Sequence, residues 1–180
     1  MRVITGELRG KRLVTVPGND LVRPTSEKVK EAIFSSIQFD IEGRNVLDLF
    51  AGSGQLGIEA LSRGAESTTF VDASNVSLDV VRQNLKGTVF EKTAKLVKRD
   101  FTSFLNTTNE MFDIAFLDPP YNAGILLKAA QLCESHINLN GTVFCEHPTE
   151  IEMPQNIGKL TMQRQYRYGN IVVTAYKKEG

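Results

Sequence analysis

The stretch NVLDLFAGSGQLGIEALSRG, residues 45–64, decides the fold class. Its first part, residues 45–50, is a short apolar run typical of a buried strand, and residues 54–64 have the apolar spacing of a helix that ends at a glycine. The turn between them has the spacing G-x-G-x-x-G, with its glycines at Gly52, Gly54 and Gly57. This order of strand, glycine-rich turn and helix predicts an α/β sheet in which a ligand closely approaches the backbone of the turn.

Strands and helices alternate along the chain from this stretch onward, and such alternation pairs the strands in parallel through right-handed crossovers. Residues 160–178 differ, because two strand-like runs flank a Gly-Asn turn and predict an antiparallel hairpin at the sheet edge. We therefore expect a doubly wound, mostly parallel sheet of seven strands. The expected strands are 45–50, 67–73, 94–100, 112–119, 141–147 and the two of the hairpin, and the expected helices are 54–64, 75–86, 101–105 and 123–136.

The residues before this sheet form a separate unit in our prediction. Residues 2–5 and 12–16 have a strand-like composition around the turn sequence GELRGK, so we expect a small N-terminal β-hairpin extension. Thr25 is the expected N-cap of the amphipathic helix that follows. We therefore divide the chain into an N-terminal arm, residues 1–24, and a main domain, residues 25–180.

Composition places the chain among globular proteins of one main domain. It has no run of about 18 or more apolar residues and no apolar signal region at its N-terminus, so we expect no membrane span and a cytoplasmic location. Cys133 and Cys145 have neither metal-binding nor redox spacing, and His136 and His147 have no metal-binding partners at suitable spacing. We therefore predict no metal site.

The chain carries equal numbers of basic and acidic side chains, but the two signs are unevenly distributed. Residues 1–30 and residues 158–180 each have a net charge of +4, whereas residues 31–157 have a net charge of −8. Such a division can place a polyanion on one surface and a cationic small molecule in another site. A scatter of solvated charge gives the same totals, so the charge distribution alone does not decide between the two interpretations.

Aspartates end four of the expected parallel strands. Each alone is common, because aspartate favours turns and caps helices. Because the carboxyl ends of parallel strands lie at one edge of a sheet, four together would give the crevice there a negative charge and several hydrogen-bond acceptors. A ligand rich in N–H and O–H donors, preferably a cation, suits such a crevice. The four aspartates are Asp48, Asp72, Asp100 and Asp118.

Two kinds of ligand are compatible with the glycine-rich turn. The G-x-G-x-x-G spacing is a dinucleotide fingerprint, and Asp72 lies where an acidic residue could hold ribose hydroxyls, so an oxidoreductase that binds NAD or FAD must be considered. Asp48 argues against a dinucleotide, because its carboxylate would repel a pyrophosphate near Gly52. S-adenosylmethionine has a nucleoside and a cationic methionine end but no phosphate, and therefore matches the aspartates better.

The chain also resembles a known family. LDLFAGSGQLGIEALSRGA, residues 47–65, is similar to motif I of class I S-adenosylmethionine-dependent methyltransferases, and DPPY, residues 118–121, is similar to their motif for methylating exocyclic amines. With RVITGELRGKRL at 2–13, VRPTSEKVKEAIF at 22–34 and YGN at 168–170, the chain resembles the bacterial 16S ribosomal-RNA guanine-N(2) methyltransferase family (RsmD-like) nearly end to end. The resemblance implies a Rossmann-like fold and S-adenosyl-L-methionine as cofactor.

The resemblance also implies roles for individual residues. It assigns the catalytic ledge to Asp118, Pro119, Pro120 and Tyr121. It assigns the cofactor pocket to Asp48, Phe50, Gly52, Gly54, Asp72, Asp100 and Phe101, with Phe101 against the adenine. The candidates for RNA contact are Arg2, Arg9, Lys11, Arg12 and Arg23, with Arg164, Arg167 and Lys177 as weaker ones. Glu146, at the end of an expected strand, is interpreted as structural.

The DPPY stretch has a chemical logic of its own. Prolines cannot continue a strand and fix φ, so they would hold Asp118 and the Pro119 carbonyl as preformed acceptors for the hydrogens of a base amine. The ring of Tyr121 offers a face for base stacking, worth about 1–3 kcal/mol. Whether Asp118 takes a proton or only accepts hydrogen bonds stays open.

The resemblance implies 16S rRNA as the substrate, within the small ribosomal subunit or one of its assembly intermediates, and methylation at the N(2) amine of a guanine. Two other activities stay open: a DNA adenine-N(6) methyltransferase, which uses the same ledge, and a dinucleotide-dependent oxidoreductase.

Overall fold

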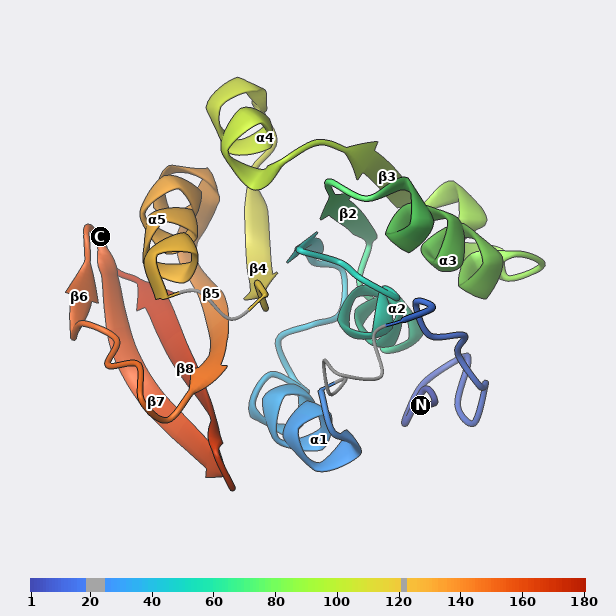
Figure 1. Ribbon diagram of the computed structural model, residues 1–180, viewed down its shortest axis with the longest axis horizontal. Coiled ribbons are helices and arrows are strands. Elements are labelled where there is room, and N and C mark those ends of the chain that lie inside the picture. Colours follow the sequence, from blue (N-terminus) through green and yellow to red (C-terminus); the bar gives the residue numbers. More distant parts are fainter. Residues whose placement is uncertain (19–24, 121–122) are drawn as a thin grey trace.

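The computed structural model describes residues 1–18, 25–120 and 123–180 (Figure 1). Its strands are β1 (Asn45–Leu49), β2 (Ser67–Asp72), β3 (Ala94–Lys98), β4 (Phe112–Leu117), β5 (Ile137–Pro148), β6 (Asn156–Ile157), β7 (Leu160–Tyr168) and β8 (Ile171–Lys178). Its helices are α1 (Glu27–Ser36), α2 (Gln55–Ser62), α3 (Asn75–Leu85), α4 (Phe101–Thr107) and α5 (Ala123–Cys133), and two short 3-10 helices are η2 (Val89–Lys92) and η3 (Glu134–His136).

The strands form one sheet in the order β3-β2-β1-β4-β5-β8-β7-β6. The five strands that alternate with helices pair in parallel, and β8, β7 and β6 add to β5 in antiparallel fashion. The predicted α/β class and the C-terminal hairpin are therefore confirmed. The described sheet has eight strands rather than seven, because β6 is a two-residue strand, too short to produce a periodic signal in the sequence.

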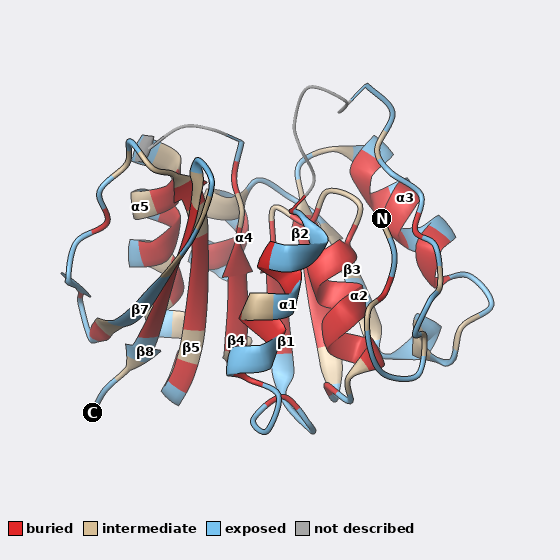
Figure 2. Ribbon diagram, turned by 90° about the horizontal axis from the view of Figure 1, so that it is seen from below, coloured by how far each residue is buried: buried red, intermediate tan, exposed pale blue. Residues whose placement is uncertain are grey.

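Helices cover both faces of the parallel half of the sheet, with α1, α2 and α3 on one face and α4 and α5 on the other (Figures 1 and 2). Side chains alternate between these faces along each strand. Phe116 of β4 and Phe144 of β5 point to the α1 face, where their rings lie 5.8 Å apart and Phe34 of α1 packs against Phe116. Residues two positions further along each strand continue the same face, which orients the side chains at the strand ends.

The N-terminal arm forms a shorter hairpin than we expected, in which three backbone hydrogen bonds pair residues 1–3 with residues 10–13. A single antiparallel bridge joins Arg2 and Arg12, and the described part of the arm, residues 1–18, contains no longer strand. The reason is that Glu59 of α2, a fully buried carboxylate, accepts the backbone N–H groups of Ile4 at 2.8 Å and Thr5 at 3.0 Å. A side chain distant in sequence therefore satisfies donors that a second strand would have used.

Apolar side chains attach the arm to the main domain as well. Val3 and Leu13 are buried in a cluster with Ile58 and Leu61 of α2 and Phe70 of β2. The arm thus lies against α2, the helix that follows the glycine-rich turn.

No helix of the described residues is long and apolar enough to cross a bilayer.

The N-terminus of α1 differs from the prediction by one residue. The N-cap is Ser26, whose Oγ accepts the backbone N–H of Val29, whereas Thr25 precedes the cap. The Thr25 side chain is therefore available for contacts with the end of the sheet.

Candidate active site

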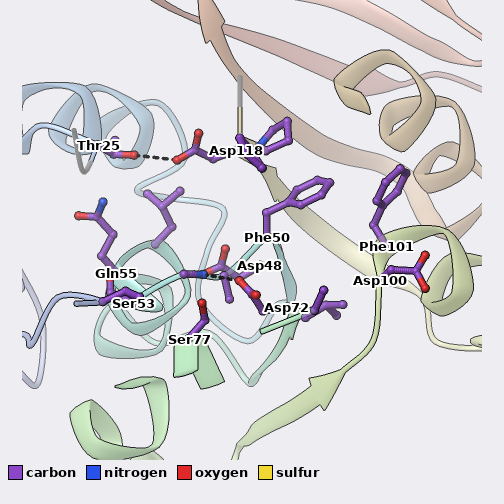
Figure 3. Close-up of a pocket in the computed structure, with 18 of the residues that line it drawn as sticks. Thr25, Asp48, Phe50, Ser53, Gln55, Asp72, Ser77, Asp100, Phe101 and Asp118 are labelled. Carbon is purple, nitrogen blue, oxygen red and sulfur yellow. Dashed lines mark hydrogen bonds between the residues drawn. The ribbon is translucent and has the colours of Figure 1, made fainter. Parts of the chain in front are cut away.

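The loops at the carboxyl ends of β1, β2, β3 and β4 surround a cavity of about 580 Å³ (Figure 3). A volume of this size is typical of small-molecule sites. The structure brings together nine of the residues singled out in the sequence, and they come from four separate strand ends. These nine are Asp48, Phe50, Gly52, Asp72, Asp100, Phe101, Asp118, Pro119 and Pro120.

Three candidates from the sequence have a different status. Gly54 does not line the cavity: it is buried, has the left-handed φ of 78° and is the N-cap of α2, and an added Cβ would lie 2.9 Å from Val81. Its role is to let the chain turn into the helix. Tyr121 and Arg23 lie outside the described residues.

Asp72 determines the shape of the glycine-rich turn. Its Oδ2 accepts the backbone N–H of Gly52 at 3.0 Å, and its Oδ1 accepts the backbone N–H of Ser74 at 2.8 Å. An added Cβ at Gly52 would meet no atom within 4 Å, so the turn leaves open space at this position. The loops after β1 and β2 are thereby connected at the rim of the cavity.

Asp48 lies at the buried base of the same turn. Its side chain is 3% exposed, and its Oδ2 accepts the backbone N–H of Gly57 at 2.9 Å. Burial raises the pKa of Asp48 to about 8, the Gly57 hydrogen bond opposes that rise, and the charges of Asp118 and Asp72 add to it. This rise favours the protonated form of Asp48, and a cation beside it would favour its ionised form.

Two aromatic rings form another wall of the cavity. The rings of Phe50 and Phe101 lie 5.3 Å apart at 49°, and Phe50 has a φ of 73°, which is rare for a residue with a side chain. Strained backbone of this kind concentrates at functional sites. Asp100, next to Phe101, accepts the backbone N–H of Ser103 at 3.0 Å and so caps α4.

Sequence reasoning missed several residues of the cavity wall. Gln55 is 7% exposed, and its Oε1 is the one buried side-chain polar atom among the described residues without a hydrogen-bond partner. A buried amide oxygen at a cavity wall suits a donor on a ligand. Its place inside motif I was the available signal. No signal marked the other missed residues, which include Met1, Thr15, Val16, Thr25 and Ser77.

Asn84 of α3 joins the arm to the glycine-rich turn. Its Oδ1 accepts the backbone N–H of Val14 at 2.7 Å, while its Nδ2 donates to the carbonyls of Val14 and Ser53, each at 3.0 Å. The side chain is 2% exposed. The arm and the cavity therefore share one buried hydrogen-bonding residue that the sequence did not reveal.

Asp118 has a partner that the sequence did not reveal. The Oγ1 of Thr25 lies 3.3 Å from Asp118 Oδ2 and 2.9 Å from Glu146 Oε2. Burial raises the pKa of Asp118 to about 6, and Thr25 opposes that rise. Burial and the charge of Asp118 raise the pKa of Glu146 to about 8. Glu146, expected to be structural, thus belongs to the surroundings of the ledge.

Four candidates for RNA contact lie on the described part of the arm, whereas the weaker candidates Arg164, Arg167 and Lys177 are exposed on β7 and β8. Arg2, Arg9 and Arg12 are exposed and Lys11 is partly buried. Arg2 forms an ion pair with Glu27 at 3.3 Å, whereas no ion pair with a described residue involves the other three. Among the described residues, no group of three or more histidine, cysteine or acidic side chains is arranged to hold a metal ion.

Comparison with known proteins identifies the family. The family model described as Conserved hypothetical protein 95 matches residues 1–177. YlbH of Bacillus subtilis strain 168 is 41% identical over 100% of both chains, and Ribosomal RNA small subunit methyltransferase D of Escherichia coli K12 is 31% identical over 99% of this chain and 90% of its own. The solved structure of yhhF from E. coli is 30% identical, with a TM-score of 0.89 over 99% of this chain and 98% of its own. The chain therefore belongs to the Conserved hypothetical protein 95 family, the family of RsmD-like methyltransferases that its motif I and DPPY sequences resemble.

Proposed function

We propose that this protein transfers a methyl group from S-adenosylmethionine to the exocyclic N(2) amine of a guanine in 16S ribosomal RNA of the small subunit. The observation that carries the proposal is the position of Asp118 and Pro119 in the wall of the same cavity that Asp48, Gly52 and Asp72 line. A cofactor site and a ledge of acceptors thus adjoin. The E. coli relative is named for a methyltransferase of small-subunit ribosomal RNA, which supports the choice of substrate.

The cavity suits S-adenosylmethionine better than a dinucleotide. Burial raises the pKa of Asp48 to about 8, so a positive charge beside it would favour its ionised form. A pyrophosphate near Gly52 would bring negative charge to a turn whose N–H already bonds the Asp72 carboxylate. The unpartnered Oε1 of Gln55 and the acceptor oxygens of Asp72 suit the ammonium and hydroxyl donors of the smaller cofactor. We assign the binding of its methionine end to Asp48 and that of its nucleoside to Asp72, Asp100 and Phe101.

The ledge supplies positioning and electrostatics. A base amine is a poor nucleophile because its lone pair is delocalised into the ring, and bound S-adenosylmethionine supplies an electrophilic methyl group. Asp118 and the Pro119 carbonyl would accept the hydrogens of the amine and aim its nitrogen at that methyl group. In its carboxylate form Asp118 would receive the proton that the amine loses as the new C–N bond forms and the bond between the methyl group and the donor's sulfur breaks.

The arm is the proposed RNA contact. Arg9 and Arg12 are exposed, and with Arg2 and Lys11 they form a set of cations that can bind phosphates and orient the substrate. The target base must leave its stack to reach the ledge, which favours an unpaired or flipped nucleotide. A small-subunit substrate also implies that the protein works in the cytoplasm.

Transfer of labelled methyl groups tests the proposal. Small subunits that lack the modification, naked 16S rRNA and duplex DNA are each incubated with the protein and labelled S-adenosylmethionine. We expect label in the ribosomal substrates and none in DNA. Label in duplex DNA alone would establish an adenine methyltransferase instead, and thermal stabilisation by NADH but not by S-adenosylhomocysteine would establish an oxidoreductase.

A further inference from the structure

Thr25 and Glu146 form a cluster with Asp118. The proposed reaction assigns a role to Asp118 but none to Thr25 or Glu146. In the parallel pair of β4 and β5, Leu117 lies opposite Cys145, so Asp118 and Glu146 follow at matching positions. Both side chains continue the face of Phe116 and Phe144, which is the face covered by α1. Thr25 stands directly before α1 and contacts both carboxyl groups.

The two contacts of the Thr25 hydroxyl group restrict where hydrogens can lie in this cluster. A threonine hydroxyl has one hydrogen, so it can donate to only one of two carboxyl groups at a time. The other contact needs a hydrogen from a protonated carboxyl group. Burial raises the pKa of both carboxyl groups, which favours one proton held within the pair. Under either assignment the contact occupies Glu146 Oε2: this oxygen accepts the Thr25 hydrogen, or it carries the proton and donates it to Thr25 Oγ1.

This arrangement fixes the other oxygen of Glu146 as an acceptor. Because the single proton of the carboxyl group is directed at Thr25, Oε1 carries no hydrogen whether Glu146 is protonated or ionised. Oε1 has no hydrogen-bond partner among the described residues. Glu146 is also only partly buried, so a ligand can reach it.

In the order of the strands, Asp118 lies between Glu146 and the loops that are proposed to bind the cofactor. Those loops follow β1, β2 and β3, whereas β5 lies beyond β4 in the order β3-β2-β1-β4-β5. Asp118 and Thr25 line the cavity, but Glu146 does not. If the cavity holds the methyl donor, a base whose amine reaches Asp118 must extend away from the glycine-rich turn, toward Glu146.

We propose that Glu146, held by Thr25, determines specificity for guanine by accepting the N1–H of the target base while Asp118 accepts its 2-amine. This inference rests on the proposed function and assigns a base-reading role to one more residue of the same site. In guanine the N1–H and the 2-amine are adjacent donors, so two neighbouring acceptors match them. In adenine the ring nitrogen next to the 6-amine, N1, is an acceptor and would face the Oε1 acceptor of Glu146 without a hydrogen between them.

A base analogue isolates this contact. 2-Aminopurine keeps the 2-amine of guanine but has an unprotonated N1 and lacks the 6-oxygen. The part of the guanine preference that disappears in Glu146 variants therefore measures the N1 contact. Small subunits are reconstituted with guanine or 2-aminopurine at the nucleotide that the wild-type protein methylates, and kcat/KM is measured for both. We expect the wild-type protein to prefer guanine by at least about tenfold, because an acceptor that the bound base shields from water and leaves without a donor is costly.

Three variants separate base reading from structure. Glu146→Leu removes the acceptor at similar volume and should reduce the guanine preference at least about fivefold, and Glu146→Ala should do the same if the leucine variant does not fold. Glu146→Gln reproduces the protonated carboxyl group, with an amide N–H toward Thr25 and an acceptor oxygen, and should retain the preference. Glu150→Gln, at an exposed position just after β5, is the matched control. It should leave kcat/KM unchanged for both the guanine and the 2-aminopurine substrate.

The outcomes distinguish this inference from the proposed function. A guanine preference that is unchanged in a folded leucine or alanine variant would overturn the role of Glu146 while methyl transfer itself stands. Equal methylation of guanine and 2-aminopurine by the wild-type protein would overturn it too. Absence of transfer from S-adenosylmethionine to any ribosomal substrate would overturn the proposed function and this inference together.

Discussion

Asp48 Oδ2 and the backbone N–H of Gly57 form a hydrogen bond of 2.9 Å that connects the end of β1 to the first turn of α2. The bond crosses the base of the glycine-rich turn and holds a buried carboxyl group beneath the cavity. Burial is the largest cause of the pKa of about 8 for Asp48. The protonation of this one group therefore depends on what occupies the cavity.

Cofactor binding should depend on pH through Asp48. A cationic ligand binds best to the ionised carboxylate, so protons compete with the ligand below a pH of about 8. We expect the affinity for S-adenosylmethionine to rise roughly tenfold between about pH 6 and pH 7, with protons released on binding. Isothermal titration calorimetry in buffers of different ionisation enthalpy measures both quantities. Asp48→Asn should flatten the pH dependence, and a wild-type affinity independent of pH would refute the role of Asp48.

Removal of the ledge carboxylate should abolish catalysis and spare the cofactor. Asp118→Ala should lower turnover at least about 100-fold, because an acceptor aimed at the reacting amine is lost. Its affinity for S-adenosylmethionine should stay within about threefold of wild type, since Asp48 and Asp72 provide the binding. Single-turnover methyl transfer and equilibrium binding give the two numbers, with Asp40→Ala at an exposed position as the control. Loss of cofactor binding in Asp118→Ala would contradict this division of roles.

Asn84 should connect the stability of the arm to that of the glycine-rich turn. Asn84→Ala removes three buried hydrogen bonds to Val14 and Ser53 and should lower the free energy of unfolding by about 2–4 kcal/mol. Hydrogen exchange should then increase both near Val14 and near Ser53. The neighbouring exposed position gives the matched control, Gln83→Ala. Faster exchange in the arm alone would show that the two segments are independent.

The cations of the arm should account for part of the salt dependence of RNA binding. Replacing Arg9, Lys11 and Arg12 with alanine should reduce the slope of log affinity against log salt by about two, because each phosphate contact contributes about 0.7. Binding to 16S rRNA is measured from low to moderate salt. The charge-retaining exchange of the same residues, arginine for lysine and the reverse, should keep the slope. A slope unchanged in the alanine variant would remove the arm from the RNA interface.

Local rules predicted the parts of the site that depend on one strand end or one turn. Asp48 and Asp72 were predicted because a glycine-rich turn follows β1 and because parallel strands bring their carboxyl ends together. Gly52 and Gly54 were both found from their spacing, but the spacing could not tell that Gly52 borders the cavity while Gly54 packs under it.

Contacts between distant segments were not predictable in this way. The hairpin of the arm is shorter than predicted because Glu59, more than fifty residues away, accepts the backbone N–H groups of Ile4 and Thr5. The hydrogen bond between Thr25 and Glu146 joins residues 121 positions apart in the sequence. It depends on the pairing of β4 with β5, which places Glu146 beside Asp118. Periodicity and capping rules act over a few residues and contain no information about such pairs.

The identity of the methylated atom tests the central claim most directly. Small subunits treated with the protein and S-adenosylmethionine are digested to nucleosides, and the product is identified by mass spectrometry against authentic methylated standards. We predict N(2)-methylguanosine, formed by the wild-type protein and absent with Asp118→Ala. A methyl group on an adenine, on another atom of guanine or on no ribosomal nucleoside at all would contradict this account.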